Sequence, residues 1–470
     1  MIGRNVLIQM TSGSLGSLIS FFTLALAARL FGPSVLGNLA YVISLFGLTF
    51  AISDLGFSRA HVHFTAGLKK AGKTFGTFIR IKLALLFLSF LIVILIALVN
   101  KVSFKGLFSL MLLYELFTRF AETVFITFEG LQQALPQNTA RIIGKLFRLI
   151  AVAALGFVLK NNLGYSLTFV VEGLILAVIA LVLIRRFKPL VYSQALAKKY
   201  FRYSLPFFAI VPLSYLQSNG IVVILKNLTN ATQVGYFSAT FGLASFIKSL
   251  FGAVMIFFFP KISTLFSKKD IKSIQHYADL TIRYLLIIFI PIFIFAFLVR
   301  HELVSLVLGS AFSPAVSVFS LFLLGMFLLM IFSPYDHILF ATRQHRPLVK
   351  VNLVSLALTV LLSLILIPSL GARGAVLTNL IVWAISGTWR LWLVKSRLKL
   401  KLLPQIFAFI SPAVIILLFF SWFLTYLPSI LMLKLLMTLL APTVYLLILF
   451  SLKLISLKDF KYFTNLIKFK

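Results

Sequence analysis

The sequence predicts an all-α polytopic membrane protein with about 14 transmembrane helices. Two features of composition point to it: 61% of the 470 residues are hydrophobic and only 11% are charged. The third observation is that the apolar residues gather into runs long enough to cross a bilayer, which takes roughly 20 residues in a helix. A soluble protein of this length would carry about 25% charged residues.

The runs follow one another in an order that suggests three parts. They lie near residues 7–30, 37–64, 79–99, 104–128, 139–159, 164–184, 203–225, 233–259, 278–299, 314–340, 348–368, 374–393, 404–426 and 429–452. We predict an N-lobe of six helices (1–200), a C-lobe of six (201–400), and two further helices with a cytoplasmic tail (401–470). The first run continues into the same pattern without a cleavage site, so it is not read as a signal peptide.

The basic residues predict the orientation of these helices. The net charge is +34, and most of the 44 Lys and Arg residues fall in alternate loops, on the side that holds both termini. By the positive-inside rule both termini are cytoplasmic, in the plasma or inner membrane. The charge then faces anionic lipid, so nucleic acid is not a predicted partner. The basic stretch 185–202 has room for an interfacial helix.

A weak internal repeat supports the two lobes. Val35–Tyr41 opens the second predicted helix, and the similar Gln233–Ala239 opens the eighth. Because each lobe has six helices, both enter the membrane in the same direction. This favours parallel repeats about an axis along the membrane normal, with a binding site where the lobes meet.

Charged residues inside predicted spans are candidate functional groups. One helical stripe in the fourth run holds Glu115, Arg119, Glu122 and Glu129, and one face of the fifth holds Arg141, Lys145 and Arg148. A hairpin turning near Leu135 would set Glu129 opposite Arg141 and Glu122 opposite Arg148. We favour a pairing network, with a proton or cation relay through a glutamate as the alternative.

Lys248 stands mid-way along the eighth run, with no acid in reach on its own helix. A lone ammonium at that depth costs at least about 2.5 kcal/mol unless it meets water, a partner or an anionic ligand. We favour a ligand, with a cross-helix ion pair as the alternative. Arg59 could snorkel and Arg29 could be a rim anchor, but both are also candidates for substrate binding.

Further candidates for coupling or for substrate contact are polar. Asp54 and Asp336 lie in or near predicted spans, and Gln9, Gln217 and Asn219 belong to polar faces of the first and seventh helices. Under the repeat, the first, second, seventh and eighth helices form equivalent pairs, so these faces predict a central cavity. His61 and His63 are expected to be solvated at the inner rim.

Some chemistries are excluded. The chain has no cysteine, so it has no disulfide and no Cys-based zinc site. Gly67–Thr74 matches the phosphate-binding loop pattern, but that mechanism needs a strand before the loop and an α/β domain around it. We therefore predict no nucleotide, metal or other cofactor, and leave H+ or Na+ open as a coupling ion.

Four motifs resemble a known family. Ala28–Pro33 followed by Ser53–Gly56 resembles the opening of polysaccharide repeat-unit flippases, the Wzx-like transporters of the MATE/MurJ (MOP) superfamily. Val234–Ala239, with Pro260 closing that helix, resembles their second-lobe motif, and Ile367–Ala375 resembles a late loop. Relatives often carry an acid in the seventh helix, where this chain has Asn219.

The resemblance implies alternating access between two six-helix lobes around a cationic cavity. The substrate would be a polyprenyl-(pyro)phosphate-linked oligosaccharide, moved from the cytoplasmic to the outer leaflet. Partners would be this glycan lipid, membrane lipids and glycan-assembly membrane proteins. A cation-coupled multidrug antiporter on the same fold, an integral-membrane glycan enzyme and a non-transporting scaffold are the competing hypotheses.

Overall fold

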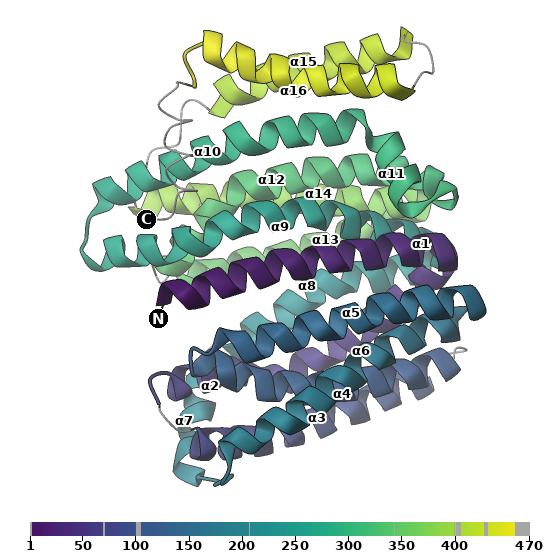
Figure 1. Ribbon diagram of the computed structural model, residues 1–470. Helices are drawn as coiled ribbons and strands as arrows, with labels where there is room; N and C mark the ends of the chain where they lie inside the picture. Colours follow the sequence, from purple (N-terminus) through teal and green to yellow (C-terminus); the bar gives the residue numbers. More distant parts are fainter. Residues whose placement is uncertain are drawn as a thin grey trace.

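The computed structural model describes residues 2–68, 71–99, 105–205, 207–342, 344–398, 400, 406–426 and 431–455, and these form an all-helical fold (Figure 1). The elements are α1 (Ile2–Asp54), α2 (Phe57–Thr65), α3 (Gly72–Val99), α4 (Lys105–Gly130), α5 (Ala134–Val158), α6 (Asn162–Leu183), η1 (Ile184–Phe187), α7 (Gln194–Ser204), α8 (Phe207–Leu228), α9 (Ala231–Ser267), α10 (Ile271–Leu298), α11 (Arg300–Leu308), η2 (Ser310–Ala315), α12 (Val316–Ala341), α13 (His345–Leu370), α14 (Ala372–Leu398), α15 (Ile406–Tyr426) and α16 (Leu431–Ser451). The predicted tail beyond residue 455 lies outside the described residues.

The first two predicted runs are the two halves of α1. The helix breaks at Gly32, whose φ of 74° lies in the left-handed region, and Pro33 restarts it. The second half ends at Asp54, ten residues before the predicted end, because Leu55 and Gly56 also adopt positive φ angles of 43° and 85°. Residues 57–65 therefore form a separate short helix, α2.

Eight helical segments of the described residues are long and apolar enough to cross a membrane. They are Thr11–Asp54, Gly72–Leu95, Asn162–Phe187, Ala231–Gly252, Ile271–Leu298, Ser310–Ala341, Pro347–Leu370 and Ile406–Leu424. The first of them contains both halves of α1. Helices α4, α5 and α14 have 26, 25 and 27 residues, the length of a span, but each carries several charged side chains. The chain is a multi-pass membrane protein.

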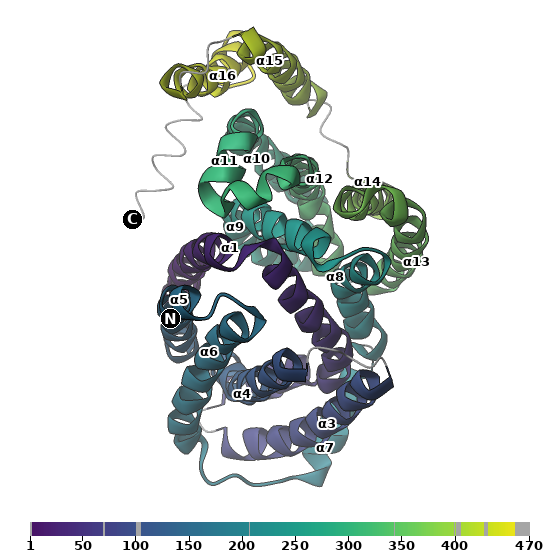
Figure 2. The ribbon, with the colours of Figure 1, turned by 90° about the vertical axis from the view of Figure 1, so that its right-hand side faces the viewer.

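The helices pack in a pattern that occurs twice. Helix α6 packs against α4 and α5, and α5 packs against α1; likewise α14 packs against α12 and α13, and α13 packs against α8. Figure 2 shows α3 to α6 on one side and α10 to α14 on the other, with α1 and α9 between them. Helices α15 and α16 pack on α10, away from the first group.

Helices α1 and α9 approach each other closely at two equivalent glycines of the sequence repeat. A Cβ atom on Gly37 would overlap the carbonyl oxygen of Ala231, and one on Gly235 would overlap that of Pro33. Ala231 precedes Gly235 by four residues, and Pro33 precedes Gly37 by four residues. The two contacts are therefore equivalent, as a two-fold relation between the helices requires. Only glycine lets the two helices cross this closely.

Candidate functional site: a charged pocket beside α8

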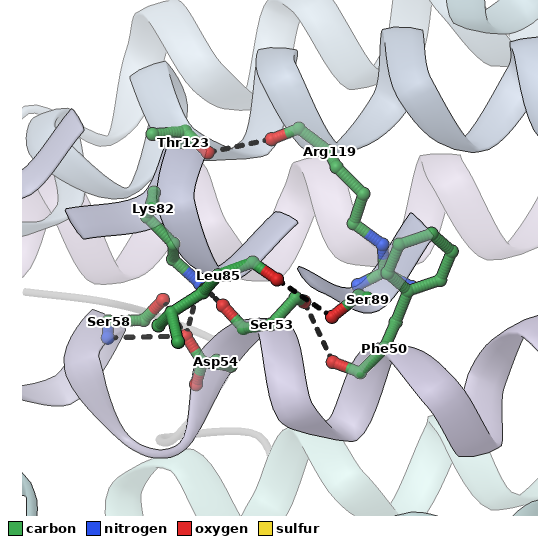
Figure 3. Close-up of polar contacts among 9 residues, drawn as sticks. All are labelled: Phe50, Ser53, Asp54, Ser58, Lys82, Leu85, Ser89, Arg119 and Thr123. Atoms are coloured by element: carbon green, nitrogen blue, oxygen red, sulfur yellow. Dashed lines mark hydrogen bonds and ion pairs between the residues drawn. The ribbon is translucent and has the colours of Figure 1, made fainter. Parts of the chain in front are cut away.

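Figure 3 shows most of the polar groups of a pocket of about 270 Å³ that lies between the first helices and α8. Its walls are the end of α1, the start of α2, one face each of α3 and α4, and a tyrosine of α8. The lining residues are Ser53, Asp54, Ser58, Lys82, Leu86, Arg119, Glu122, Thr123, Ile126 and Tyr215. We call it the charged pocket.

An ion pair closes one end of the charged pocket. The Lys82 ammonium lies 2.5 Å from the Asp54 carboxylate and donates to the Ser53 carbonyl oxygen at 3.1 Å. The backbone N–H and the hydroxyl of Ser58 also donate to Asp54. The chain reversal at Leu55 and Gly56 makes this possible, because Asp54 ends α1 and its carboxylate caps the first turn of α2.

Arg119 forms the opposite wall and connects it to α8. Its guanidinium lies 2.9 Å from Glu115, one helical turn earlier, and over the ring of Phe50, 4.7 Å from the centroid. It also donates to the Tyr215 hydroxyl. Glu115 and Arg119, which share the predicted helical stripe, thus form an ion pair, and Tyr215 brings α8 to the pocket.

A second ion network crosses α4, α5 and α6. Arg141 pairs with Glu122 at 2.7 Å, and Arg148 pairs with Glu172 of α6 at 3.4 Å. The predicted register was therefore wrong: Glu122 faces Arg141, and Arg148 does not face Glu122. The reason is that the turn lies at residues 131–133, since α5 begins at Ala134. This earlier turn moves the partner of Arg141 from the predicted Glu129 to Glu122, about two helical turns away.

Buried partners of other kinds complete this network. The Arg148 guanidinium lies 3.4 Å from the centre of the Phe169 ring and donates to the Tyr165 hydroxyl. Lys145 donates to the carbonyl oxygen of Gly16 on α1 at 3.0 Å. The Arg148 contacts join α5 to α6, and the Lys145 contact attaches the first half of α1 to α5.

In the second group of helices, the predicted coupling residue Asp336 is paired. Its carboxylate lies 2.7 Å from Arg390 of α14. Arg390 also donates to Asn352 of α13 and to Ser386, each at 3.0 Å. The cluster joins α12, α13 and α14.

The predicted substrate residues lie elsewhere. Lys248 is exposed on α9 and one turn from Gly252, beside which there is open space. Among the described residues no acid lies within ion-pair range of it. Arg29 donates to the Leu306 carbonyl oxygen of α11, and Arg59 lies over the Phe207 ring at 4.9 Å.

The polar candidates are also spread out. Asn219 donates to the Tyr215 carbonyl oxygen at 3.1 Å and packs against Gly47 of α1. Gln217 is half-buried on the same helix, and Gln9 is exposed on α1. The structure brings Asn219 next to Tyr215, but it places neither Gln9 nor Lys248 in the wall of the charged pocket.

Sequence reasoning missed Lys82 and Glu172. Lys82 falls inside the predicted run 79–99, and an ionisable residue within a span is the signal that could have found it. Glu172 likewise lies inside the run 164–184. Tyr215 carries no such signal.

His61 corrects another prediction. It is fully buried, with its ring nitrogens 2.7 Å from the Tyr200 hydroxyl of α7 and 2.8 Å from the Thr127 hydroxyl of α4. Its ring stacks on Phe78 at 4.0 Å. Burial lowers the pKa of His61 to about 3, so the imidazole stays neutral. His63 is exposed, as predicted.

The sequence matches two known family models. Residues 2–266, just over half of the chain, match the model of the family described as polysaccharide biosynthesis protein. The chain belongs to this family. Residues 142–446 also match the family model of the lipid II flippase MurJ. A search of curated proteins finds no significant match.

Solved structures show the same fold. A structure of the lipid II flippase MurJ in an inward closed conformation superposes with a TM-score of 0.74 at 15% identity, covering 98% of this chain and 100% of that one. An inward-facing multidrug resistance MATE transporter of the MOP superfamily gives 0.55 at 15% identity, covering 84% and 94%. A Vibrio cholerae MATE transporter mutant gives 0.54 at 16% identity, covering 85% and 98%. The fold is that of MurJ and MATE transporters.

Proposed function

We propose that the protein is a flippase that moves a polyprenyl-(pyro)phosphate-linked oligosaccharide from the cytoplasmic to the outer leaflet by alternating access. Membership of the polysaccharide biosynthesis family supports this. The single observation that carries the choice of substrate is the charge balance of the embedded groups: Asp54, Glu115, Glu122, Glu172 and Asp336 each pair with Lys or Arg, whereas Lys248 has no described acid partner.

This balance favours an anionic over a cationic substrate. A cavity for organic cations needs a free carboxylate, whereas these five acids are occupied and Asp279 of α10 accepts a hydrogen bond from Gln275 at 2.8 Å. An unpaired ammonium, by contrast, is stabilised by a phosphate through charge-assisted hydrogen bonds. In the proposal Lys248, Arg59 and Arg29 contact the diphosphate at different stages of transport, and Gln9, Gln217 and Asn219 contact the glycan.

The lobes are the moving parts of the proposed mechanism. Residues 1–200 form the N-lobe, 201–400 the C-lobe and 401–470 the last two helices and tail, which makes fourteen spans. The repeated packing pattern and the reciprocal crossing of Gly37 and Gly235 support a parallel two-fold repeat. Asp54, Glu115, Arg119, Glu122, Arg148 and Asp336 are the proposed coupling or gating groups, because their ion pairs hold each lobe together.

Both termini are proposed to be cytoplasmic. The natural chain has no cysteine, so single cysteines can be introduced without background labelling. Ala195→Cys and Asn161→Cys should react with a membrane-impermeant maleimide from opposite sides of the bilayer. Labelling of both from one side would contradict the proposed topology.

The direct test of function is reconstitution in liposomes. Transbilayer movement of a lipid-linked oligosaccharide should exceed that of empty liposomes, and imposing a proton or sodium gradient will identify the coupling ion. Lys248→Ala should abolish movement and Lys248→Arg should keep most of it, while Lys160→Ala, an exposed lysine outside the site, should be neutral. Full activity of Lys248→Ala would refute the assigned role, and efflux of a cationic dye without glycan movement would establish the antiporter instead.

A further inference from the structure

The segment between α6 and α8 is fixed rigidly to one end of the first helix group. It contains η1 and α7, which lies near α2 and α3 (Figure 1). Tyr200 of α7 is fully buried and its hydroxyl contacts His61. The N–H of Ser193 donates to the Thr77 hydroxyl of α3 at 3.1 Å. The outward face of α7 is therefore held in a fixed position.

That outward face is strongly basic. Six cations of the segment are exposed: Arg185, Arg186, Lys188, Lys198, Lys199 and Arg202. The sequence has no acid between Glu172 and Asp270, and none of the six is in an ion pair within the described part of the chain. Lys198 and Arg202 stand four residues apart on one helix, an arrangement in which like charges repel. Such a face is stabilised by an external anion.

Large apolar side chains lie among these cations. Phe201 and Leu205 are 54% and 55% exposed and stand one helical turn apart. Val191 and Tyr192, just before the helix, are also exposed, and the Arg80 guanidinium lies over the Tyr192 ring at 5.0 Å. Exposed aromatic and aliphatic groups beside lysines and arginines are the pattern of a helix that lies in a membrane interface.

We propose that this segment, residues 184–205, binds the headgroups of anionic phospholipids at the membrane surface. Lys198, Lys199 and Arg202 hold the phosphate and glycerol groups, while Phe201 and Leu205 enter the acyl boundary. Charge complementarity selects the lipid, because a surface with six unpaired cations attracts anionic headgroups over zwitterionic ones. The site requires that α7 lies at the bilayer surface, and it does not depend on the substrate that the protein transports.

The test measures which lipid gathers beside α7. Ala195→Cys, labelled with a fluorophore, is reconstituted in phosphatidylcholine vesicles with one fifth phosphatidylglycerol. A trace of nitroxide-labelled lipid is added with either headgroup. Spin-labelled phosphatidylglycerol should quench at least about twofold more than spin-labelled phosphatidylcholine. About 1 M salt should reduce the difference in quenching between the two spin-labelled lipids, because it shortens the screening length.

Variants separate this site from general surface charge. Lys198→Gln with Lys199→Gln and Arg202→Gln should bring the quenching ratio near one. The matched triple Lys268→Gln, Lys269→Gln and Lys272→Gln, on another exposed basic stretch, should leave it unchanged. These positions are exposed, and an unaltered gel-filtration profile will show that both triples fold. Equal quenching by the two lipids would overturn the proposal. The absence of quenching by either lipid would also overturn it, and would indicate that a protein partner binds this face. Neither result bears on glycan movement, which the Lys248 variants test.

Discussion

Breaking the Asp54–Lys82 pair should destabilise the protein strongly. The side chains of Lys82 and Asp54 are only 10% and 23% exposed, so Lys82→Met leaves a carboxylate that water reaches poorly. Removing one partner of a buried pair costs about 3–5 kcal/mol. Because Asp54 keeps both hydrogen bonds from Ser58, we expect the lower end of this range, about 3 kcal/mol. In detergent, this should appear as a melting temperature lowered by several degrees.

Removing both charges should be milder than removing one. The double variant Asp54→Asn with Lys82→Met leaves no unpaired charge, and an uncharged replacement of a buried pair is often close to neutral. We expect its free energy of unfolding to lie within about 1 kcal/mol of that of the wild type. The double-mutant cycle then gives a large coupling energy between the two side chains. If the pair also serves coupling, the double variant will be stable but will no longer respond to an ion gradient in the liposome assay.

The control is Lys73→Met, an exposed lysine in the first turn of α3, which should not change the melting temperature. Two results would refute the reasoning. If Lys82→Met melts like the wild type, water or another group compensates Asp54. If the double variant is as unstable as Lys82→Met, the loss comes from the packing of the Lys82 side chain and not from the charge.

Three further predictions concern other parts of the fold. Gly235→Val should disrupt the crossing with Pro33 and abolish both stable folding and transport. Gly13→Ala, beside open space, should be tolerated. The yield and the gel-filtration profile of each variant measure this. His61, with a pKa of about 3, binds its proton mainly in the unfolded state. Lowering the pH from 7.5 to 5 should therefore reduce the stability of the wild type by about 2 kcal/mol more than that of His61→Gln. Thermal melts of both proteins at both pH values measure this, and an equal pH dependence would contradict it. Arg390→Met should leave the Asp336 carboxylate without a partner and lower the free energy of unfolding by about 3 kcal/mol. The double variant Arg390→Met with Asp336→Asn should recover most of this loss. No recovery would mean that the hydrogen bonds of Arg390 matter more than its charge.

The positions of the helices could be predicted because a segment that crosses a membrane must be apolar along its whole length. A span must be apolar for about 20 residues. Each predicted run overlaps a helix of the structure, and the first two runs share α1. The ends were harder to predict. Nothing in the apolar pattern marks Asp54 as an end, because Leu55 is an unusual residue at positive φ and the apolar run continues to residue 64.

Most side-chain pairs could not be predicted, for a different reason. The pair Glu115–Arg119 lies on one helix, where the spacing alone brings the groups together. Pairs between helices depend on where the chain turns, and placing the α4–α5 turn near residue 135 was enough to give Arg148 the wrong partner. Lys82 and Asp54 come together only because α1 ends where it does.

The distribution of the ion pairs bears on how such a protein can change shape. Asp54–Lys82 and Glu122–Arg141 lie within the proposed N-lobe, and Asp336–Arg390 lies within the C-lobe. The contacts named above between the lobes are of another kind: single hydrogen bonds, such as that of Arg119 to Tyr215, and the close backbone approach of α1 and α9. A rocking motion about that crossing would break neutral or singly charged hydrogen bonds, which cost about 0.5–3 kcal/mol each. The ion pairs found in the described part of the chain each lie within one lobe and would stay intact. Lys248, which has no acid partner among the described residues, is in the proposed mechanism a charge that can take up and release an anionic headgroup without the loss of an ion pair.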